Sequence, residues 1–568
     1  THVDAISHMG RRHRERSIDT MPLTTFYTEG ICLDLSHKGL MELIEVEDLR
    51  RALSDVAGTQ QRLLLATLKR NEDTEYGRRH GFAGIRSANE YRERAPLTDY
   101  GDYAEAVERI GAGEKNVLTS EEALLLEPTS GSTQATKLIP YTRSLKNEFA
   151  RGIAAWVWDL FSHDPRLMLG SAYWSITPLA YREERTPGGI PIGFEEDTQY
   201  LGGLGALLSQ VMVVPSEVRQ IDDIESFRYV TLLFMLRARS MALISVWNPT
   251  FLTLLMSRLP EWHLRLAYDL ETGSLSPPTP IPEGVRLSAL NSPAPRRAAE
   301  LRKAFRSGDE PATIHSSLWP RLRLLSCWDD GHAALHAPEA ARLFPQARVQ
   351  GKGLLATECF VSLPLIGQTG AVLALRSHFL EFIPHGSEGE TLLAHELEEG
   401  GHYSVVVTTG GGLYRYQLGD VVEVTGRFEK CPLLRFLGKE DLVSDRYGEK
   451  LNERHAREAL RGALARHAPD APFAMLAFEE ESSSYTLFIE AKGVRETALL
   501  SLADHIEGEL RENHHYRYCR ALGQLGYLRV FRIRRGAAET HQAVCRSGGQ
   551  RAGDVKPAAL HVMSDWSR

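Results

Sequence analysis

The chain of 568 residues has little cysteine and no recognisable cysteine pattern. Its six cysteines are scattered, and no two stand at the short spacings of a zinc site or a redox-active pair. Zinc scaffolds and disulfide frameworks both depend on such pairs. The distribution therefore argues against either kind of site and favours the reducing cytoplasm as the location of the protein.

A long uncharged apolar run is also lacking. The most apolar stretch, "YVTLLFMLRARSMALISVW", contains Arg237 and Arg239, which would be costly in a bilayer, and it predicts a buried helix. Residues 1–22 are polar and basic and predict an unordered leader. A formal charge of -8 and a pI near 6.3 give no general attraction to nucleic acid or anionic lipid. We therefore expect neither a nucleic-acid partner nor a membrane partner.

The composition is that of a globular protein, with 43% hydrophobic and 25% charged residues. A chain of this length exceeds one ordinary core, so we expect more than one domain. Helical spacing predicts an amphipathic helix over Glu47–Arg70, and strand-like runs crowd together before Lys439. We predict an α/β protein, with a large N-terminal domain of sheets and packed helices over 23–438. A small, mobile α/β C-terminal domain should follow over 439–568.

The segment "EPTSGSTQATKLIPYT" holds hydroxyl side chains around a glycine, between two short apolar runs and ahead of a helical pattern. Backbone N–H groups of a glycine-containing turn and neighbouring hydroxyls bind phosphate oxygens. The usual P-loop is excluded, because Lys137 precedes a strand-like run instead of opening a helix. Taken alone, such a loop is more often a solvated turn. The residues that could wrap a triphosphate are Thr129, Ser130, Gly131, Ser132 and Thr133.

Two carboxylates stand at positions that suit the same ligand. The run "GLLATECF" places Thr357 and Glu358 at the end of an expected buried strand, and "YRYQLGD" places Asp420 behind an expected hairpin turn. One carboxylate can bind Mg²⁺, and another can accept hydrogen bonds from both ribose hydroxyls. Together with the hydroxyl loop, these residues suggest one nucleotide pocket.

The order of these motifs resembles the Gretchen Hagen family of acyl-acid amido synthetases, a branch of the adenylate-forming superfamily. The motifs "TSGST", "ATECF", "RYQLGDVVEVTG" and "LRFLGKEDLVSDRYGEKLNE" follow in that order, and the resemblance spans most of Arg70–Leu560. It implies an enzyme that uses ATP and Mg²⁺ to convert a carboxylic acid into an acyl-adenylate, with release of pyrophosphate. Transfer of the acyl group to an amine, usually that of an amino acid, then forms an amide.

The resemblance also assigns roles to single residues. The hydroxyl and the Mg²⁺ ligand of the family fall on Thr357 and Glu358, and its ribose acceptor falls on Asp420. Its terminal lysine, which would stabilise charge at the α-phosphate, falls on Lys556. At Leu354 the family often has a tyrosine beside the adenine, so packing there must be apolar. The expected hinge consists of Gly438, Lys439 and Glu440. Lys439 is also expected to contact the nucleotide.

Two alternatives to amide formation stay open. One is transfer of the acyl group to a thiol such as that of coenzyme A, and the other is a non-catalytic protein that binds a nucleotide or an acyl compound. We expect a monomer or a weak homodimer. Aromatic residues that could line the acyl pocket, although each could equally belong to the core, are Tyr173, Trp174, Trp247 and Phe251.

Two histidines invite a metal-site interpretation that we do not favour. The run "CWDDGHAALH" places His332 and His336 four residues apart, near two aspartates. Gly331 is a weak helix residue, so the helical geometry that would bring both rings to one metal is disfavoured. A turn lining the nucleotide or acyl pocket is the better interpretation.

Overall fold

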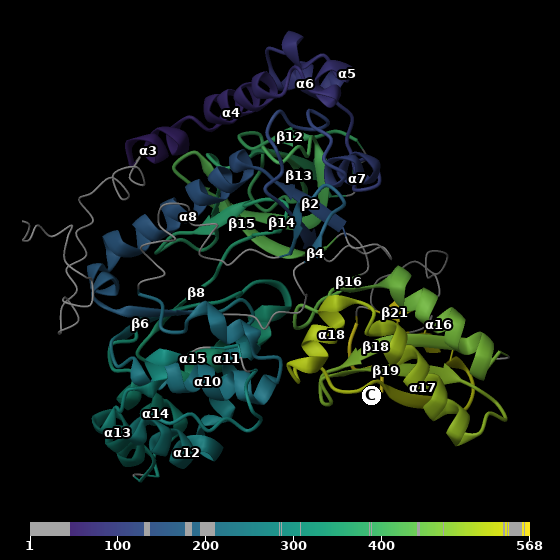
Figure 1. Cartoon of the computed structure of the whole chain (residues 1–568). Coiled ribbons are helices and arrows are strands. Elements are labelled where there is room, and N and C mark those ends of the chain that lie inside the picture. Colours follow the sequence, from purple (N-terminus) through teal and green to yellow (C-terminus); the bar gives the residue numbers. More distant parts are fainter. Residues whose placement is uncertain are drawn as a thin grey trace, which may run out of the picture.

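The computed structural model places the chain around several sheets, each with its own topology (Figure 1). Between residues 46 and 537, it describes 46–129, 137–175, 184–193, 211–439 and 443–537, apart from 283, 286, 307, 386, 388 and 470. Beyond that it describes residues 540–541, 544, 559–561 and 563–567.

A seven-stranded antiparallel sheet lies in the upper part of Figure 1, in the order β12-β11-β13-β14-β15-β10-β9. The glycine turn at 410–412 joins two of its strands, and Gly412 has a φ of +96° with Leu118 packed close to where a side chain would stand. The strands are β9 (Ser362–Pro364), β10 (Ala371–Leu373), β11 (Phe379–Pro384), β12 (Leu392–Leu393), β13 (His402–Thr408), β14 (Tyr416–Phe428) and β15 (Cys431–Lys439).

N-terminal helices cover this sheet at the top of Figure 1. The helix expected over Glu47–Arg70 is two helices, because Asp55 separates them and its side chain accepts a hydrogen bond from the Gly58 N–H at 3.1 Å. The amide of Gln60 donates to the carbonyls of Leu375 and His378, both at 2.8 Å, which joins the second helix to the sheet. The helices are α3 (Val46–Ser54), α4 (Val56–Arg70), α5 (Glu75–Arg79), α6 (Ala88–Arg94) and α7 (Ala104–Gly111).

A parallel sheet, β3-β6-β7-β8, packs with helices in the lower part of Figure 1. Its strands are β3 (Ser171–Trp174), β6 (Met241–Ser245), β7 (Leu324–Ser326) and β8 (Arg348–Gln350). Its helices are α10 (Ile224–Arg237), α11 (Pro249–Ser257), α12 (Leu259–Thr272), α13 (Pro295–Arg306), α14 (Pro311–Leu318) and α15 (Ala337–Leu343).

The single buried helix predicted around Arg237 and Arg239 is therefore wrong in part. Helix α10 ends at Arg237, and the rest of the apolar run forms the buried strand β6. A continuous apolar run suits a buried parallel strand as well as a buried helix, so the pattern alone could not place this boundary.

A third sheet, β2-β1-β5-β4, lies beside the seven-stranded sheet. Its strands are β1 (Leu125–Thr129), β2 (Lys137–Tyr141), β4 (Glu184–Arg185) and β5 (Pro191–Ile192), and helix α8 (Arg143–His163) follows β2. The hydroxyl loop thus joins two antiparallel strands ahead of a helix, as its sequence predicts.

The described residues after 442, here called the C-terminal module, form an α/β unit at the lower right of Figure 1. A four-stranded sheet, in the order β20-β19-β18-β21, shares a hydrophobic core with the module's helices. The elements are β16 (Val443–Ser444), β17 (Leu451–Asn452), α16 (Glu453–His467), β18 (Phe473–Glu479), β19 (Ser484–Glu490), α17 (Glu496–Leu510), α18 (His514–Ala521), β20 (Arg529–Ile533) and β21 (Leu560–His561).

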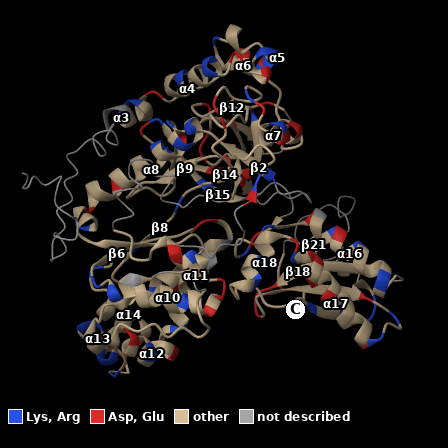
Figure 2. Cartoon of the chain, viewed as in Figure 1, with Lys and Arg blue, Asp and Glu red and all other residues tan. Residues whose placement is uncertain are grey.

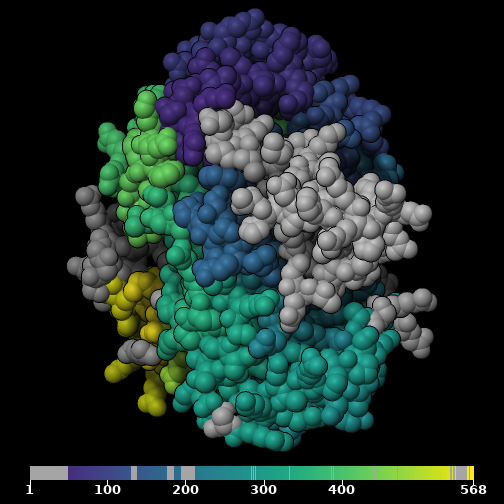
Figure 3. All heavy atoms as spheres, turned by 90° about the vertical axis from the view of Figure 1, so that its left-hand side faces the viewer, coloured from purple at the N-terminus to yellow at the C-terminus, as the bar shows by residue number. Residues whose placement is uncertain are grey.

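The surface carries charges of both signs. Figure 2 shows basic and acidic residues interspersed over the helices of each region. Seen from the side in Figure 3, the N-terminal helices and the helices of the parallel sheet lie at opposite ends of the molecule. Among the described residues, no helix has the length and apolar character needed to cross a membrane.

Candidate functional site

The hairpin of β1 and β2 presents the two ends of the expected phosphate loop. Thr129 and Lys137 face each other at the last rung before the loop. The hydroxyl of Tyr100 accepts the Leu138 N–H at 2.7 Å, and the Lys137 ammonium lies 5.6 Å from the centre of the Tyr100 ring. The expected phosphate-binding residues from Ser130 to Thr133 lie outside the described residues, so the structure places the base of this loop.

Thr357 and Glu358 occupy a tight turn, and the expectation that they end a buried strand is wrong. Ala356 and Cys359 exchange backbone hydrogen bonds of 3.0 and 3.3 Å across the turn. Strand β8 has already ended at Gln350, so the apolar residues ahead of the turn belong to a loop with one isolated bridge. Within the turn Thr357 is half-buried and Glu358 is buried.

The turn is held next to the hairpin. The hydroxyl of Tyr141, the last residue of β2, donates to the Thr357 carbonyl at 2.6 Å. Leu354 precedes the turn and is 9% exposed, and its N–H donates to the Ser362 hydroxyl at 3.0 Å. The expected apolar neighbour of the adenine is thus a core leucine close to the turn.

Asp420 comes to the same place from the seven-stranded sheet. It is buried in β14 opposite Lys439 of β15. Burial raises the pKa of the Tyr416 phenol, and the negative charges of Glu358 and Asp420 raise it further. The charges of both predicted carboxylates therefore act on Tyr416, although they are 62 positions apart in the sequence.

The Glu358 charge also reaches Tyr100, whose pKa is raised by burial first and then by nearby carboxylates. The Tyr100 hydroxyl bonds to β2, and Thr98 pairs with Tyr416 of β14. Tyr141 of β2 bonds to the turn, so the hairpin, the turn and β14 lie close together. Two carboxylates beside the base of a hydroxyl-rich loop can hold the sugar and the cation of a nucleotide.

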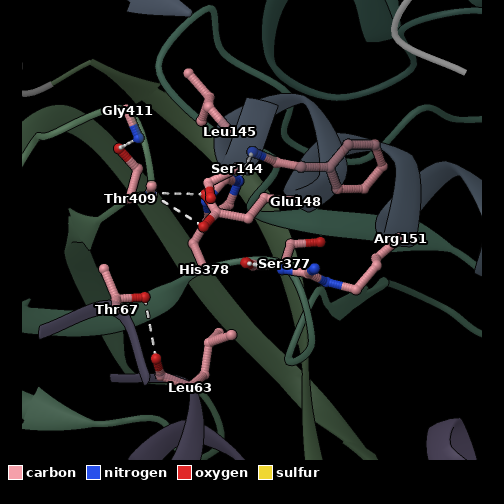
Figure 4. A network of polar contacts seen from close by, with 12 residues as sticks. Leu63, Thr67, Ser144, Leu145, Glu148, Arg151, Ser377, His378, Thr409 and Gly411 are labelled. Carbon is pink, nitrogen blue, oxygen red and sulfur yellow. Dashed lines mark hydrogen bonds and ion pairs between the residues drawn. The ribbon is translucent and has the colours of Figure 1, made fainter. Parts of the chain in front are cut away.

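Buried polar contacts fix this arrangement from behind, and sequence reasoning missed them (Figure 4). The Glu148 carboxylate of α8 accepts the Gly410 N–H at 2.9 and 3.0 Å. His378 Nδ1 lies 2.8 Å from Glu148 Oε2, at an angle poor for a hydrogen bond, and its Nε2 accepts the Phe360 N–H at 2.9 Å. The Thr142 hydroxyl donates to the Gly410 carbonyl at 2.9 Å. The contacts join α8, the glycine turn and the segment just after Glu358.

The four acyl-pocket candidates fall into two pairs. Trp174 and Trp247 are half-buried and flank the Lys352 ammonium, which lies 5.4 and 4.9 Å from their ring centres. Tyr173 is fully buried in the helical core, because successive strand residues point to opposite faces of a sheet. Phe251 packs against Phe227 with ring centres 6.5 Å apart. The sequence signal that could have pointed to Lys352 is its place between two glycines ahead of the Thr357 motif.

The expected hinge lies at the end of β15. Gly438 has a φ of +157° and open space around it, and Lys439 is the last residue of the strand. Glu440 and Lys556 lie outside the described residues. The ring of His336 lies 5.3 Å from that of Tyr447 in the C-terminal module, so this histidine lies at a contact between regions. Within the described part of the chain, no three His, Cys, Asp or Glu side chains are grouped to hold a metal.

The fold is that of solved acyl acid amido synthetases. The solved GH3.15 acyl acid amido synthetase aligns with a TM-score of 0.61 and 21% identity, over 92% of this chain and 94% of its own. The structure of AtGH3.15 in complex with 2,4-DB gives a TM-score of 0.62 and 20% identity, over 91% and 93% of the two chains.

Family models for the GH3 family N-terminal, central and C-terminal domains match residues 45–349, 371–439 and 454–561. The chain belongs to the GH3 family. The putative indole-3-acetic acid-amido synthetase GH3.9 of Arabidopsis thaliana is 26% identical over 87% of this chain and 90% of its own length. The putative indole-3-acetic acid-amido synthetase GH3.10 of Oryza sativa subsp. japonica is 25% identical over 74% of this chain and 86% of its own.

Proposed function

We propose that this protein is an ATP-dependent acyl-acid amido synthetase, which activates a carboxylic acid as its adenylate and transfers the acyl group to an amine, that of an amino acid. The observation that carries the proposal is the contact of the Glu358 turn with the hairpin that bears the hydroxyl loop, beside strand β14 with Asp420. Its curated relatives are named as amido synthetases, which supports an amine acceptor.

The chemistry explains why a nucleotide is needed. A carboxylate is a poor acyl donor, because oxide would have to leave, whereas AMP is a good leaving group. Attack of the carboxylate oxygen on the α-phosphate forms the anhydride and breaks the bond to pyrophosphate. Negative charge gathers at that phosphate in the transition state, so groups that hold the charge there accelerate the step.

Each residue has a part in this scheme. The loop from Ser130 to Thr133 binds phosphate oxygens, Asp420 accepts the ribose hydroxyls, and Lys556 stabilises the charge at the α-phosphate. Glu358 is the carboxylate that fits Mg²⁺, which is often held in phosphate sites by one or two carboxylates together with phosphate oxygens and water. When bound, Mg²⁺ supplies positive charge at the phosphates. Thr357 offers its hydroxyl to the nucleotide from the same turn.

The second half-reaction needs the amine to reach the adenylate while water is kept away. We propose that residues 23–438 and 439–568 act as two domains, and that the smaller one turns about Gly438, Lys439 and Glu440 between the steps. The positive φ of Gly438 near the end of β15 and the open space around it support a hinge at this place.

The test is a panel of carboxylic acids incubated with the protein, ATP, Mg²⁺ and either amino acids or coenzyme A. Pyrophosphate release followed by an amide of the expected mass supports the proposal. A thioester without amide would replace the amine by a thiol as acceptor. ATP binding without pyrophosphate release from any acid would favour a non-catalytic binding protein.

Two variants test the division of roles. Asp420→Ala should weaken ATP binding itself, whereas Lys556→Ala should lower pyrophosphate release far more than ATP binding. The exposed Asp222→Ala is the matched control for the aspartate and Lys492→Ala for the lysine. Equal losses of ATP affinity in both test variants would contradict these roles.

A further inference from the structure

The carboxyl ends of the parallel strands form one continuous row. Trp174, Ser245, Ser326 and Gln350 are directly paired neighbours across β3, β6, β7 and β8, and each is the last residue of its strand. In sheets of this kind, ligands bind outside the carboxyl ends of the strands. The row is therefore a place to look for a binding site.

Lys352 lies over this row and is held there from several sides. Its ammonium lies 2.8 Å from the Ser245 hydroxyl and 3.3 Å from the Ser326 hydroxyl, and both serines are fully buried. The faces of Trp174 and Trp247 flank the same ammonium. Hydroxyls and indole faces orient an ammonium group. The positive charge thus has a fixed position at the edge of the sheet.

Further aromatic side chains extend the site around this charge. Trp156 donates its indole N–H to Gln350 at 2.9 Å and packs on Trp174 with ring centres 5.9 Å apart. Trp328 packs on Trp247 with ring centres 5.8 Å apart. Trp174, Trp247, Trp328 and Lys352 are each half-buried, so part of this aromatic and basic cluster is exposed.

We propose that Lys352 is a specificity-determining residue of the acyl site, which binds a second hydrogen-bond acceptor on the acid substrate. The substrate class is then a planar acid that carries a hydroxyl, a keto oxygen or a second carboxylate besides the carboxylate that is activated. The inference rests on the proposed function, because it names the acid of that reaction.

The second acceptor fits Lys352 better than the reacting carboxylate does. A lysine paired with the reacting carboxylate would withdraw charge from the nucleophile and would stabilise the ground state, which does not help catalysis. The reacting carboxylate also has to face the phosphates, and the residues assigned to these lie at the hairpin and the Thr357 turn. A charge fixed by two serines and two tryptophans at the sheet edge suits the far end of the acid.

The experiment compares matched acids on the full-length wild-type protein and on Lys352→Met. The probes are benzoate, phenylacetate and 3-phenylpropanoate, each beside its 4-hydroxy and 4-carboxy counterpart. Binding is followed by quenching of tryptophan fluorescence, since the site is lined by indoles, and adenylation by pyrophosphate release. Lys352→Arg keeps the charge, and Lys303→Met on the exposed face of α13 is the matched control.

A charged donor should favour the acids with a second acceptor by about 10- to 100-fold in the wild type. Lys352→Met should remove that preference and leave the plain acids within about threefold, while Lys352→Arg should keep part of it. An unchanged preference in a folded Lys352→Met variant, or an equal loss for all acids, would overturn the inference. Binding of none of the acids by the wild type would also overturn it.

These outcomes separate the inference from the proposed function. If the wild type releases pyrophosphate with any acid while the preference does not depend on Lys352, only the inference fails. If the acids bind with a preference that depends on Lys352 and no pyrophosphate is released, the acyl site stands and the proposed reaction fails.

Discussion

The hairpin with the Thr357–Glu358 turn and the C-terminal module are attached to the rest of the chain in different ways. The hairpin and the turn are fixed by buried contacts, from Tyr141 to the Thr357 carbonyl and from His378 to the Phe360 N–H. The module meets α10 and α11 through polar contacts of Arg228 with the Leu522 carbonyl and of Gln524 with Thr250.

The difference bears on how the two half-reactions are organised. Groups that stabilise a transition state act best when they are fixed before the substrate arrives. Polar contacts between regions of a chain permit relative motion more readily than a large apolar interface does. These contacts support the proposal that the hairpin and the turn stay in place while the module turns relative to them.

The largest effect should come from the carboxylate at the fixed turn. Glu358→Gln keeps the size of the side chain but removes the charge that would hold Mg²⁺, and it should lower the rate of pyrophosphate release by about 100- to 1000-fold. Glu122→Gln, which removes a carboxylate paired with Lys115 at the surface, is the matched control. A loss below tenfold, measured at saturating ATP and acid, would remove Glu358 from the charge-stabilising set.

A buried histidine need not act in catalysis, and His315, which lies in the helical core, tests this point. Burial in the helical core lowers the pKa of His315 to about 4. Between pH 6.5 and 4 the unfolded chain therefore binds more protons at this position than the folded one does, so stability falls as the pH falls through that window.

His315→Phe should remove this part of the pH dependence, about 3 kcal/mol over the window, from urea unfolding curves. His263→Phe, at a partly exposed histidine stacked on Phe305, is the matched control. Pyrophosphate release at pH 7.5 should stay within about twofold of wild type, because His315 packs against Phe344 in the helical core. Parallel curves for wild type and His315→Phe would contradict the assignment.

His378 is equally buried but lies directly behind the turn, so changing it should affect both stability and catalysis. His378→Leu leaves the Phe360 N–H without its acceptor and should lower the free energy of unfolding by about 2 kcal/mol. If His378 positions the turn, kcat for pyrophosphate release falls more than the KM for the acid rises. His402→Leu on β13, which is exposed, is the matched control. A loss of stability with unchanged kcat would leave His378 a purely structural residue.

The sequence revealed the motifs but not what holds them together. The hydroxyl loop between two strands follows from local pattern, because turn residues and apolar runs are visible within a dozen positions. The contact of Glu148 with Gly410 joins residues 262 positions apart, and that of Lys352 with Ser245 spans 107 positions. No periodicity within a segment reports such a pair, so the buried contacts behind the turn and Lys352 emerged only from the fold.

The smallest effect should come from the contacts of the C-terminal module. Arg228→Ala removes a buried donor to the Leu522 carbonyl and the ion pair with Glu225, whereas Arg302→Ala, the matched control, removes an arginine of α13 paired with Glu271. Loss of one such contact shifts a balance between two domain arrangements by about 1 kcal/mol, or roughly fivefold. Arg228→Ala should therefore change the ratio of amide formation to pyrophosphate release by about fivefold at an unchanged KM for ATP. An unchanged ratio in a variant with wild-type thermal stability would mean that this contact does not govern the turning of the module.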